Sequence, residues 1–139
     1  MSRKTRDVAG IKLWSEVVRE YFGHACQRCG RAHGRMNAHH IIRRANYVHR
    51  YNPDNGLCLC VHCHVWGKTF SAHGTPEDFL AWFAEYDPLW NSWRIRHKND
   101  SMKDEGRLFT SWNIPYIESE ITKLKAVRAA GGIKEPMRD

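Results

Sequence analysis

The first half of the chain combines one helical pattern of apolar residues with two short apolar runs. Apolar residues recur at helical spacing and Gly23 follows them, which predicts a helix over about residues 9–22. The runs NAHHII (37–42) and GLCLC (56–60) are bounded by turn-forming residues and predict two strands. The segment VHCHVWGK (61–68) has the pattern of the start of a helix. The apolar positions of the first helix are Ile11, Trp14, Val17, Val18, Tyr21 and Phe22.

The second half of the chain predicts helices. Thr75 is the expected N-cap of a helix over about 76–86, with Pro76 in its first turn. A further helix ends in the basic run RIRHK (94–98), which we expect in solvent, and Pro115 opens a last helix that a Gly-Gly pair stops. Aromatic stripes at helical spacing are more often core than platforms for stacked bases, so we expect them to be buried. The apolar positions of the three helices are Phe79, Trp82, Phe83 and Tyr86, then Leu89, Trp90, Trp93 and Ile95, then Ile117, Ile121, Leu124 and Val127.

Length and apolar content point to one domain. A chain of 139 residues can bury one compact core but is too short for two independent ones. The sequence holds no apolar run of 18 residues and no pattern of a secretory leader, which predicts a cytoplasmic protein without a membrane partner.

The net charge of +7 is unevenly distributed. Residues 1–51 hold 11 Lys/Arg against 3 Asp/Glu, a net +8, whereas residues 52–139 hold 11 against 12, a net −1. Concentrated positive charge fits a polyanionic partner, because each neutralised phosphate releases condensed counterions. A generally basic surface without such a partner is the alternative that charge alone leaves open.

Four of the five cysteines form two C-x2-C pairs, Cys26 with Cys29 and Cys60 with Cys63. This spacing lets two thiolates of one tight turn occupy two corners of a tetrahedron, so the pairs predict one structural Zn²⁺. The odd count disfavours a disulfide framework. A redox motif, which needs one pair in a βαβ setting, and chance spacing are the alternatives. Cys58 alternates with two leucines along the second predicted strand, and we expect it to be a buried free thiol.

Three histidines and an asparagine lie among the cysteine pairs at a distinctive spacing. His39 and His40 are adjacent in the sequence. Asn55 lies 16 residues after His39, and His64 lies nine residues after Asn55. The stretch from about 24 to 68 resembles the HNH endonuclease family, in its phage type with a zinc-stabilised ββα-metal unit. The motifs that carry the resemblance are CQRCG (26–30), AHHII (38–42), NGLCLC (55–60) and CVHCH (60–64).

The resemblance implies a role for each of these residues. His39 and His64 would bind one catalytic divalent ion (Mg²⁺, Mn²⁺ or Ni²⁺), and His40 would be the general base that deprotonates the attacking water. Asn55 would tie the loop that orients this base, although an ordinary Asn-Gly turn is the alternative. Chemistry gives an independent reason for these residue types, since phosphodiester hydrolysis needs an activated water, a metal and positioning. Chance, or a single zinc cluster that uses histidine in place of cysteine, is the alternative for the histidine pair.

Adjacent residues on a strand point to opposite faces, so His39 and His40 cannot both face one ion. Some family members carry a further metal-binding histidine one helical turn after His64, where this chain has Lys68. Lys68 and the loop residues Arg43, Arg44 and Arg50 are candidates for contacts with DNA phosphates, and a solvated loop face is the alternative. No role is assigned to His24, His33, His62 and His73.

Together these features predict a single α+β domain over residues 1–139. We expect a basic N-terminal helix (1–23), a zinc-bound ββα-metal core (24–70) and a helical C-terminal extension (71–139). The expected function is metal-dependent cleavage of DNA, in phage DNA processing, recombination or packaging alongside terminase, in the cytoplasm of the host cell. A zinc-finger-like module that binds DNA without cleavage and a nuclease selective for branched DNA are the alternatives. Sequence specificity, nicking versus double-strand cutting and oligomeric state are not encoded in any recognisable pattern.

Overall fold

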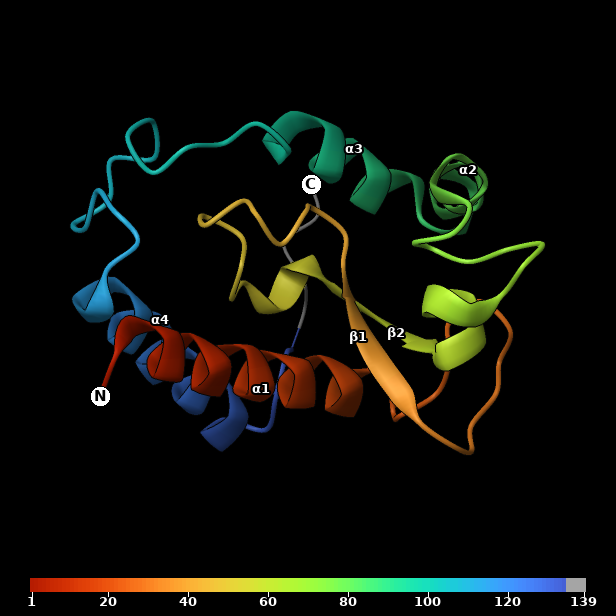
Figure 1. Cartoon of the computed structure of the whole chain (residues 1–139), viewed down its shortest axis with the longest axis horizontal. Coiled ribbons are helices and arrows are strands. Elements are labelled where there is room, and N and C mark those ends of the chain that lie inside the picture. Colours follow the sequence, from red (N-terminus) through yellow and green to blue (C-terminus); the bar gives the residue numbers. More distant parts are fainter. Residues whose placement is uncertain (135–139) are drawn as a thin grey trace.

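The computed structural model describes residues 1–134, which form a mixed α+β fold. In Figure 1, α1 and α4 lie together along one edge of the molecule, α2 and α3 lie along the opposite edge, and the two strands lie between them. Among the described residues, no helix combines the length and the apolar character that crossing a membrane requires. The elements in chain order are α1 (Arg3–Tyr21), β1 (Met36–His40), η1 (Pro53–Asn55), β2 (Gly56–Cys60), η2 (His62–Trp66), α2 (Pro76–Tyr86), α3 (Pro88–His97) and α4 (Ile114–Ala129).

The sheet consists of β1 and β2, paired antiparallel, and the loop 41–55 joins them. His40 lies opposite Gly56 and His39 lies opposite Leu57. His40 stacks on Trp14 of α1, whereas His39 packs against Phe79 of α2. The alternation expected along a strand therefore places the two histidines on different faces of the hairpin.

Two helices differ from their predicted limits for identifiable reasons. Helix α1 starts at Arg3, six residues before the predicted start, because the Ser2 hydroxyl accepts a hydrogen bond from the Thr5 N–H and caps a first turn that has no apolar face. After β2 the chain makes only the five-residue π-helical turn η2 where a longer helix was expected. The structure thus has two strands and a short helical turn in this region, and the ββα-metal fold stays a prediction.

The C-terminal helices agree closely with their patterns. Helix α2 spans the predicted residues, but the hydroxyl of its N-cap Thr75 bonds to Ser71 and not to the helix. Phe79, Phe83, Trp90 and Trp93 are buried as expected, whereas Leu89 and Ile95 are exposed. The aromatic stripes are therefore mainly core.

Apolar side chains gather in two clusters on the two sides of the hairpin. One contains the cysteine-rich strand β2 and the inner faces of α2 and α3. The other contains Trp14 and Val18 of α1, Tyr51 of the loop and the inner face of α4. Gly56 lets α1 approach the sheet, because a Cβ there would overlap Val18 and lie 2.9 Å from Trp14. The hairpin is therefore held between two packed layers.

Candidate metal centres and a basic cleft

Four cysteines from two separate turns meet at the end of β2. The sulfur atoms of Cys26, Cys29, Cys60 and Cys63 all lie within 4.8 Å of one another, and Cys29 Sγ and Cys60 Sγ are 3.7 Å apart. Thiolates bound tetrahedrally to Zn²⁺ at about 2.3 Å are themselves about 3.8 Å apart. In each pair the N–H of the second cysteine lies 3.5 Å from the sulfur of the first. The group could therefore bind a structural metal ion, as the two C-x2-C pairs predict.

The residues beside this group explain its local shape. Gly30 follows the first pair with φ +80°, a conformation that glycine adopts without strain, and its N–H donates to the Cys26 carbonyl at 2.9 Å. Cys58 is fully buried and lies outside the four-cysteine group. Burial raises the pKa of Cys58 to about 11, so this thiol stays protonated. Cys58 is the buried free thiol expected from its place in the strand.

Three histidines form a second group with ligand atoms within 4.8 Å of one another: His39, His64 and His73. The Nε2 atoms of His64 and His73 are 3.1 Å apart. Imidazole nitrogens bound to one ion at about 2.0–2.1 Å lie about 2.9–3.4 Å apart, depending on the coordination angle. Nδ1 of His39 is buried and has no hydrogen-bond partner within residues 1–134, and a cation is one partner that could satisfy it. The group could therefore hold a metal ion with three protein ligands and an open coordination position.

His73 is the member of this group that the sequence did not identify. Two backbone hydrogen bonds place it beside His64, from the Ala72 N–H to the Cys63 carbonyl at 2.8 Å and from the His73 N–H to the His64 carbonyl at 3.0 Å. The chain thus returns past η2 and brings His73 beside His64. No periodicity marks such a return, so only the structure could reveal it.

The protonation of His39 and His64 is compatible with metal binding. Burial lowers the pKa of His39, and it lowers the pKa of His64 to about 4. Both rings are therefore neutral near pH 7, the form that ligates metals. The Asn37 side chain lies 3.1 Å from His64 Nδ1 and has no other partner in the described part of the chain. The atom that faces Nδ1 is the amide nitrogen Nδ2, and turning the amide over would present Oδ1 to accept from Nδ1–H and leave Nε2 as the ligand.

His40 lies next to this group but is held differently. Its ring stacks on Trp14 with a centroid distance of 3.8 Å and an interplanar angle of 11°. Its Nε2 is 2.9 Å from the Arg50 carbonyl oxygen, which can only accept, so Nε2 carries the proton. Burial lowers the pKa of His40 to about 4, although the Arg50 carbonyl acts in the opposite direction. The ring is neutral, and Nδ1 remains as the basic atom.

Asn55 is fully buried and connects both ends of the loop. Its Oδ1 accepts from the Ile42 N–H at 2.6 Å, and its Nδ2 donates to the carbonyls of Ile42 and His49 at 2.9 and 3.1 Å. An exposed turn asparagine would make no such set of bonds. The carbonyl of Arg50, which orients His40, directly follows His49 in the chain. Asn55 thus fixes the loop that positions this carbonyl.

A cleft of about 1480 Å³ contains the three-histidine group and His40, because its lining includes His39, His40, His64 and His73. The predicted phosphate contacts Arg43 and Arg44 are exposed and line the same cleft. Lys68 is exposed but lies outside the lining. The basic end of α3, expected in solvent, contributes Arg94 and Lys98 to the lining.

Arg50 differs from the other arginines of the loop. It is buried, and its Nε and Nη2 donate to the two oxygens of Asp7 at 2.7 Å each. Its Nη1 donates to the Arg44 carbonyl at 2.9 Å. Burial acts to raise the pKa of Asp7, but hydrogen bonds from Arg50 and Tyr51 and the nearby positive charges keep it below its usual range. This ion pair joins α1 to the loop. Because its guanidinium is already paired with Asp7, Arg50 is not among the proposed DNA contacts.

A third group, His49, His97 and Asp100, also has ligand atoms within 4.8 Å. Asp100 Oδ2 accepts from His49 Nε2 at 2.9 Å and from His97 Nδ1 at 2.7 Å. Asn52 Oδ1 accepts from the Asp54 N–H, which turns the Asn52 Nδ2 donor toward His49 Nδ1. His49 Nδ1 is therefore an acceptor, and its Nε2 carries the proton. The hydrogen bonds satisfy this group without an ion, so we interpret it as a structural link between α3 and the loop.

Comparison with protein families, with curated proteins and with solved structures finds no match to this chain. The function must therefore be argued from the site itself.

Proposed function

We propose that this chain is a metal-dependent endonuclease that hydrolyses DNA phosphodiester bonds, in the manner of the HNH family that its motifs resemble. One observation carries the proposal. The neutral His40, whose Nε2 donates to the Arg50 carbonyl, lies in the same basic cleft as three histidines whose ligand atoms lie within 4.8 Å of one another. A base, a metal site and a phosphate-attracting surface are the three components that phosphodiester hydrolysis needs.

Each of these residues would have a separate role in the reaction. His40 Nδ1 would take a proton from a water molecule, whose oxygen then attacks phosphorus while the bond to the leaving oxygen breaks. The Arg50 carbonyl and the Trp14 ring would hold the His40 imidazole in the orientation that this transfer requires. His39, His64 and His73 would hold a divalent ion, which when bound supplies positive charge to the phosphate and the leaving oxygen.

The ligand set also bears on the choice of ion. Imidazole suits Ni²⁺ and Zn²⁺, whereas Mg²⁺ and Mn²⁺ prefer oxygen ligands. Three histidines without a carboxylate therefore favour Ni²⁺ over Mg²⁺ among the ions considered. Phage DNA processing or packaging alongside terminase stays a prediction from the resemblance.

The test is cleavage of supercoiled plasmid by zinc-replete protein with Mg²⁺, Mn²⁺ or Ni²⁺ added separately. We expect His40→Ala to lower the cleavage rate about 10²–10⁴-fold, the range for loss of a general base. His33→Ala, which removes an exposed histidine outside the cleft, is the matched control and should cut like the wild type. If the wild type binds DNA but cuts with none of the metals, the nuclease proposal fails and a DNA-binding module is favoured. Branched substrates of the same sequence would then separate a structure-selective nuclease from both.

A further inference from the structure

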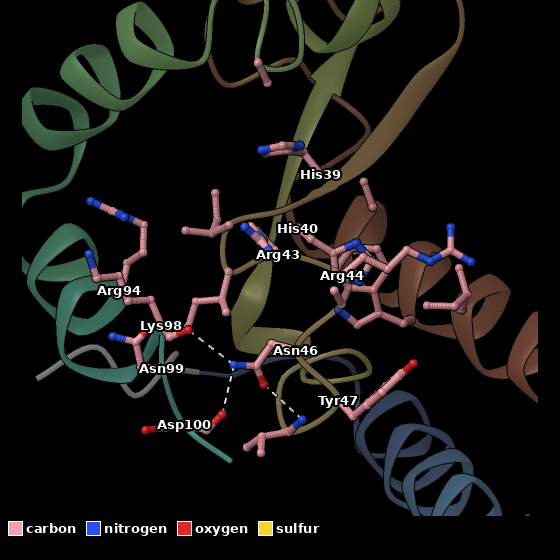
Figure 2. Close-up of a pocket in the computed structure, with 18 of the residues that line it drawn as sticks. His39, His40, Arg43, Arg44, Asn46, Tyr47, Arg94, Lys98, Asn99 and Asp100 are labelled. Carbon is pink, nitrogen blue, oxygen red and sulfur yellow. Dashed lines mark hydrogen bonds between the residues drawn. The ribbon is translucent and has the colours of Figure 1, made fainter. Parts of the chain in front are cut away.

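Helix α3 forms one wall of the cleft, and no residue of this wall has a role in the proposed chemistry. Arg94 and Lys98 are four residues apart, so they lie on one face of the helix, and both line the cleft. Figure 2 shows these two residues on α3 at one side of the pocket and Arg44 toward the other, with His39 and His40 between the two sides. Positive charge therefore faces the histidines from two separate parts of the chain.

The charges that line the cleft are unbalanced. None of its cations forms an ion pair with a residue in the described part of the chain. Asp100 is the one acidic residue in the lining, and its Oδ2 already accepts from two histidines. Unpaired cations in one concavity repel one another, and a bound polyanion would relieve that repulsion. The lining cations are Arg35, Arg43, Arg44, Arg94, Lys98 and Lys103.

The α3 wall is fixed relative to the loop 41–55. Asn46 Nδ2 donates to the Asp100 carbonyl at 3.1 Å and to the Lys98 carbonyl at 3.4 Å. The Asp100 carboxylate accepts from His49 of the loop at 2.9 Å. Arg94 Nε donates to Asn91 Oδ1 at 3.1 Å, which orients its guanidinium. A ligand that touches this wall is therefore held at a defined position relative to His40.

We propose that Arg94 and Lys98 bind the phosphate backbone of the DNA strand that enters the cleft, across from Arg43 and Arg44. The inference rests on the proposed function for the identity of the polyanion. Phosphate contacts fix the position of a strand without reading its sequence, and the guanidinium fork can bind two phosphate oxygens. Cations on both sides of His39 and His40 would place a backbone phosphate between them.

The experiment measures binding of a fluorescein-labelled duplex between 50 and 200 mM salt, in zinc-replete protein carrying His40→Ala so that the DNA stays intact. The test variant is Arg94→Ala/Lys98→Ala. The matched control is Arg96→Ala/Lys125→Ala, which removes the same charge from exposed positions on α3 and α4 that do not line the cleft. Thermal melting of each variant checks that the fold is retained.

Each phosphate contact contributes about −0.9 to the slope of log K against log salt. Loss of two contacts should therefore flatten the slope by about 1.8, so that the fall in affinity over this fourfold range of salt becomes about tenfold smaller. The control variant should keep the slope of its parent. Equal slopes for the two double variants would overturn the inference even if the wild type cleaves DNA. Absence of DNA binding by the parent would overturn both proposals, and a flattened slope without cleavage by the wild type would overturn the nuclease alone.

Discussion

The four-cysteine group and the three-histidine group offer metal ligands in opposite ways. The cysteine group supplies four thiols, three of them buried, and leaves no coordination position open. The histidine group supplies three ligands, its His73 is exposed, and all three line the cleft. Closed tetrahedral sites hold a fold together, whereas sites with an open position do chemistry on what binds there. From this comparison we propose a structural role for the cysteine group and a catalytic role for the histidine group.

The largest expected effect is the loss of the cysteine group. We expect Cys60→Ser to abolish zinc retention and unfold the hairpin, because structural zinc in such small units contributes about 10–16 kcal/mol, as much as the whole stability of a domain. Circular dichroism during heating, with zinc measured in the same samples, checks this. Cys58→Ala is the matched control, since Cys58 is buried in the same strand but outside the group. A Cys60→Ser protein that melts like the wild type would show that the group is not structural.

Prediction from the sequence succeeded where a residue's neighbours in the chain determine its place. The two C-x2-C pairs fix their own geometry through tight turns, and the apolar patterns of β2 and α2 agree with the observed elements. The alternation along β1 correctly separates His39 from His40. Residues close together in the sequence determine these features, so the sequence was sufficient to predict them.

The features that could not be predicted from the sequence depend on contacts between distant segments of the chain. His73 reaches His64 only because the chain folds back after η2 and pairs through backbone hydrogen bonds. Arg50 looks like another loop cation in the sequence, and its pairing with Asp7, 43 residues away, is visible only in three dimensions. The basic end of α3 likewise faces the cleft because of its hydrogen bonds to Asn46. Such contacts leave no periodic signal in the residues that make them.

A smaller effect distinguishes the ligands within the histidine group. We expect His73→Ala to weaken activation by the divalent ion about 10–100-fold while leaving the fold and the zinc content unchanged, because His73 is exposed and only completes the group. Cleavage measured across a titration of Ni²⁺ gives the half-maximal concentration. His62→Ala, which removes the exposed histidine at the start of η2, should leave this concentration unchanged. If His73→Ala and His62→Ala require the same Ni²⁺ concentration, the open site consists of His39 and His64 alone.

The smallest expected effect concerns the third group, which resembles a metal site in composition and spacing but is held by hydrogen bonds. Asp100→Asn keeps one oxygen acceptor but loses the charge that holds His49 and His97, so we expect the free energy of unfolding to fall by about 1 kcal/mol. The metal concentration for half-maximal cleavage should stay that of the wild type. Chemical denaturation measures the first quantity, and the Ni²⁺ titration measures the second. A change in metal content or in the metal requirement would show that His49, His97 and Asp100 bind an ion after all. The unsatisfied Nδ1 of His39 in one group and the satisfied side chains of the other would then no longer identify the metal site.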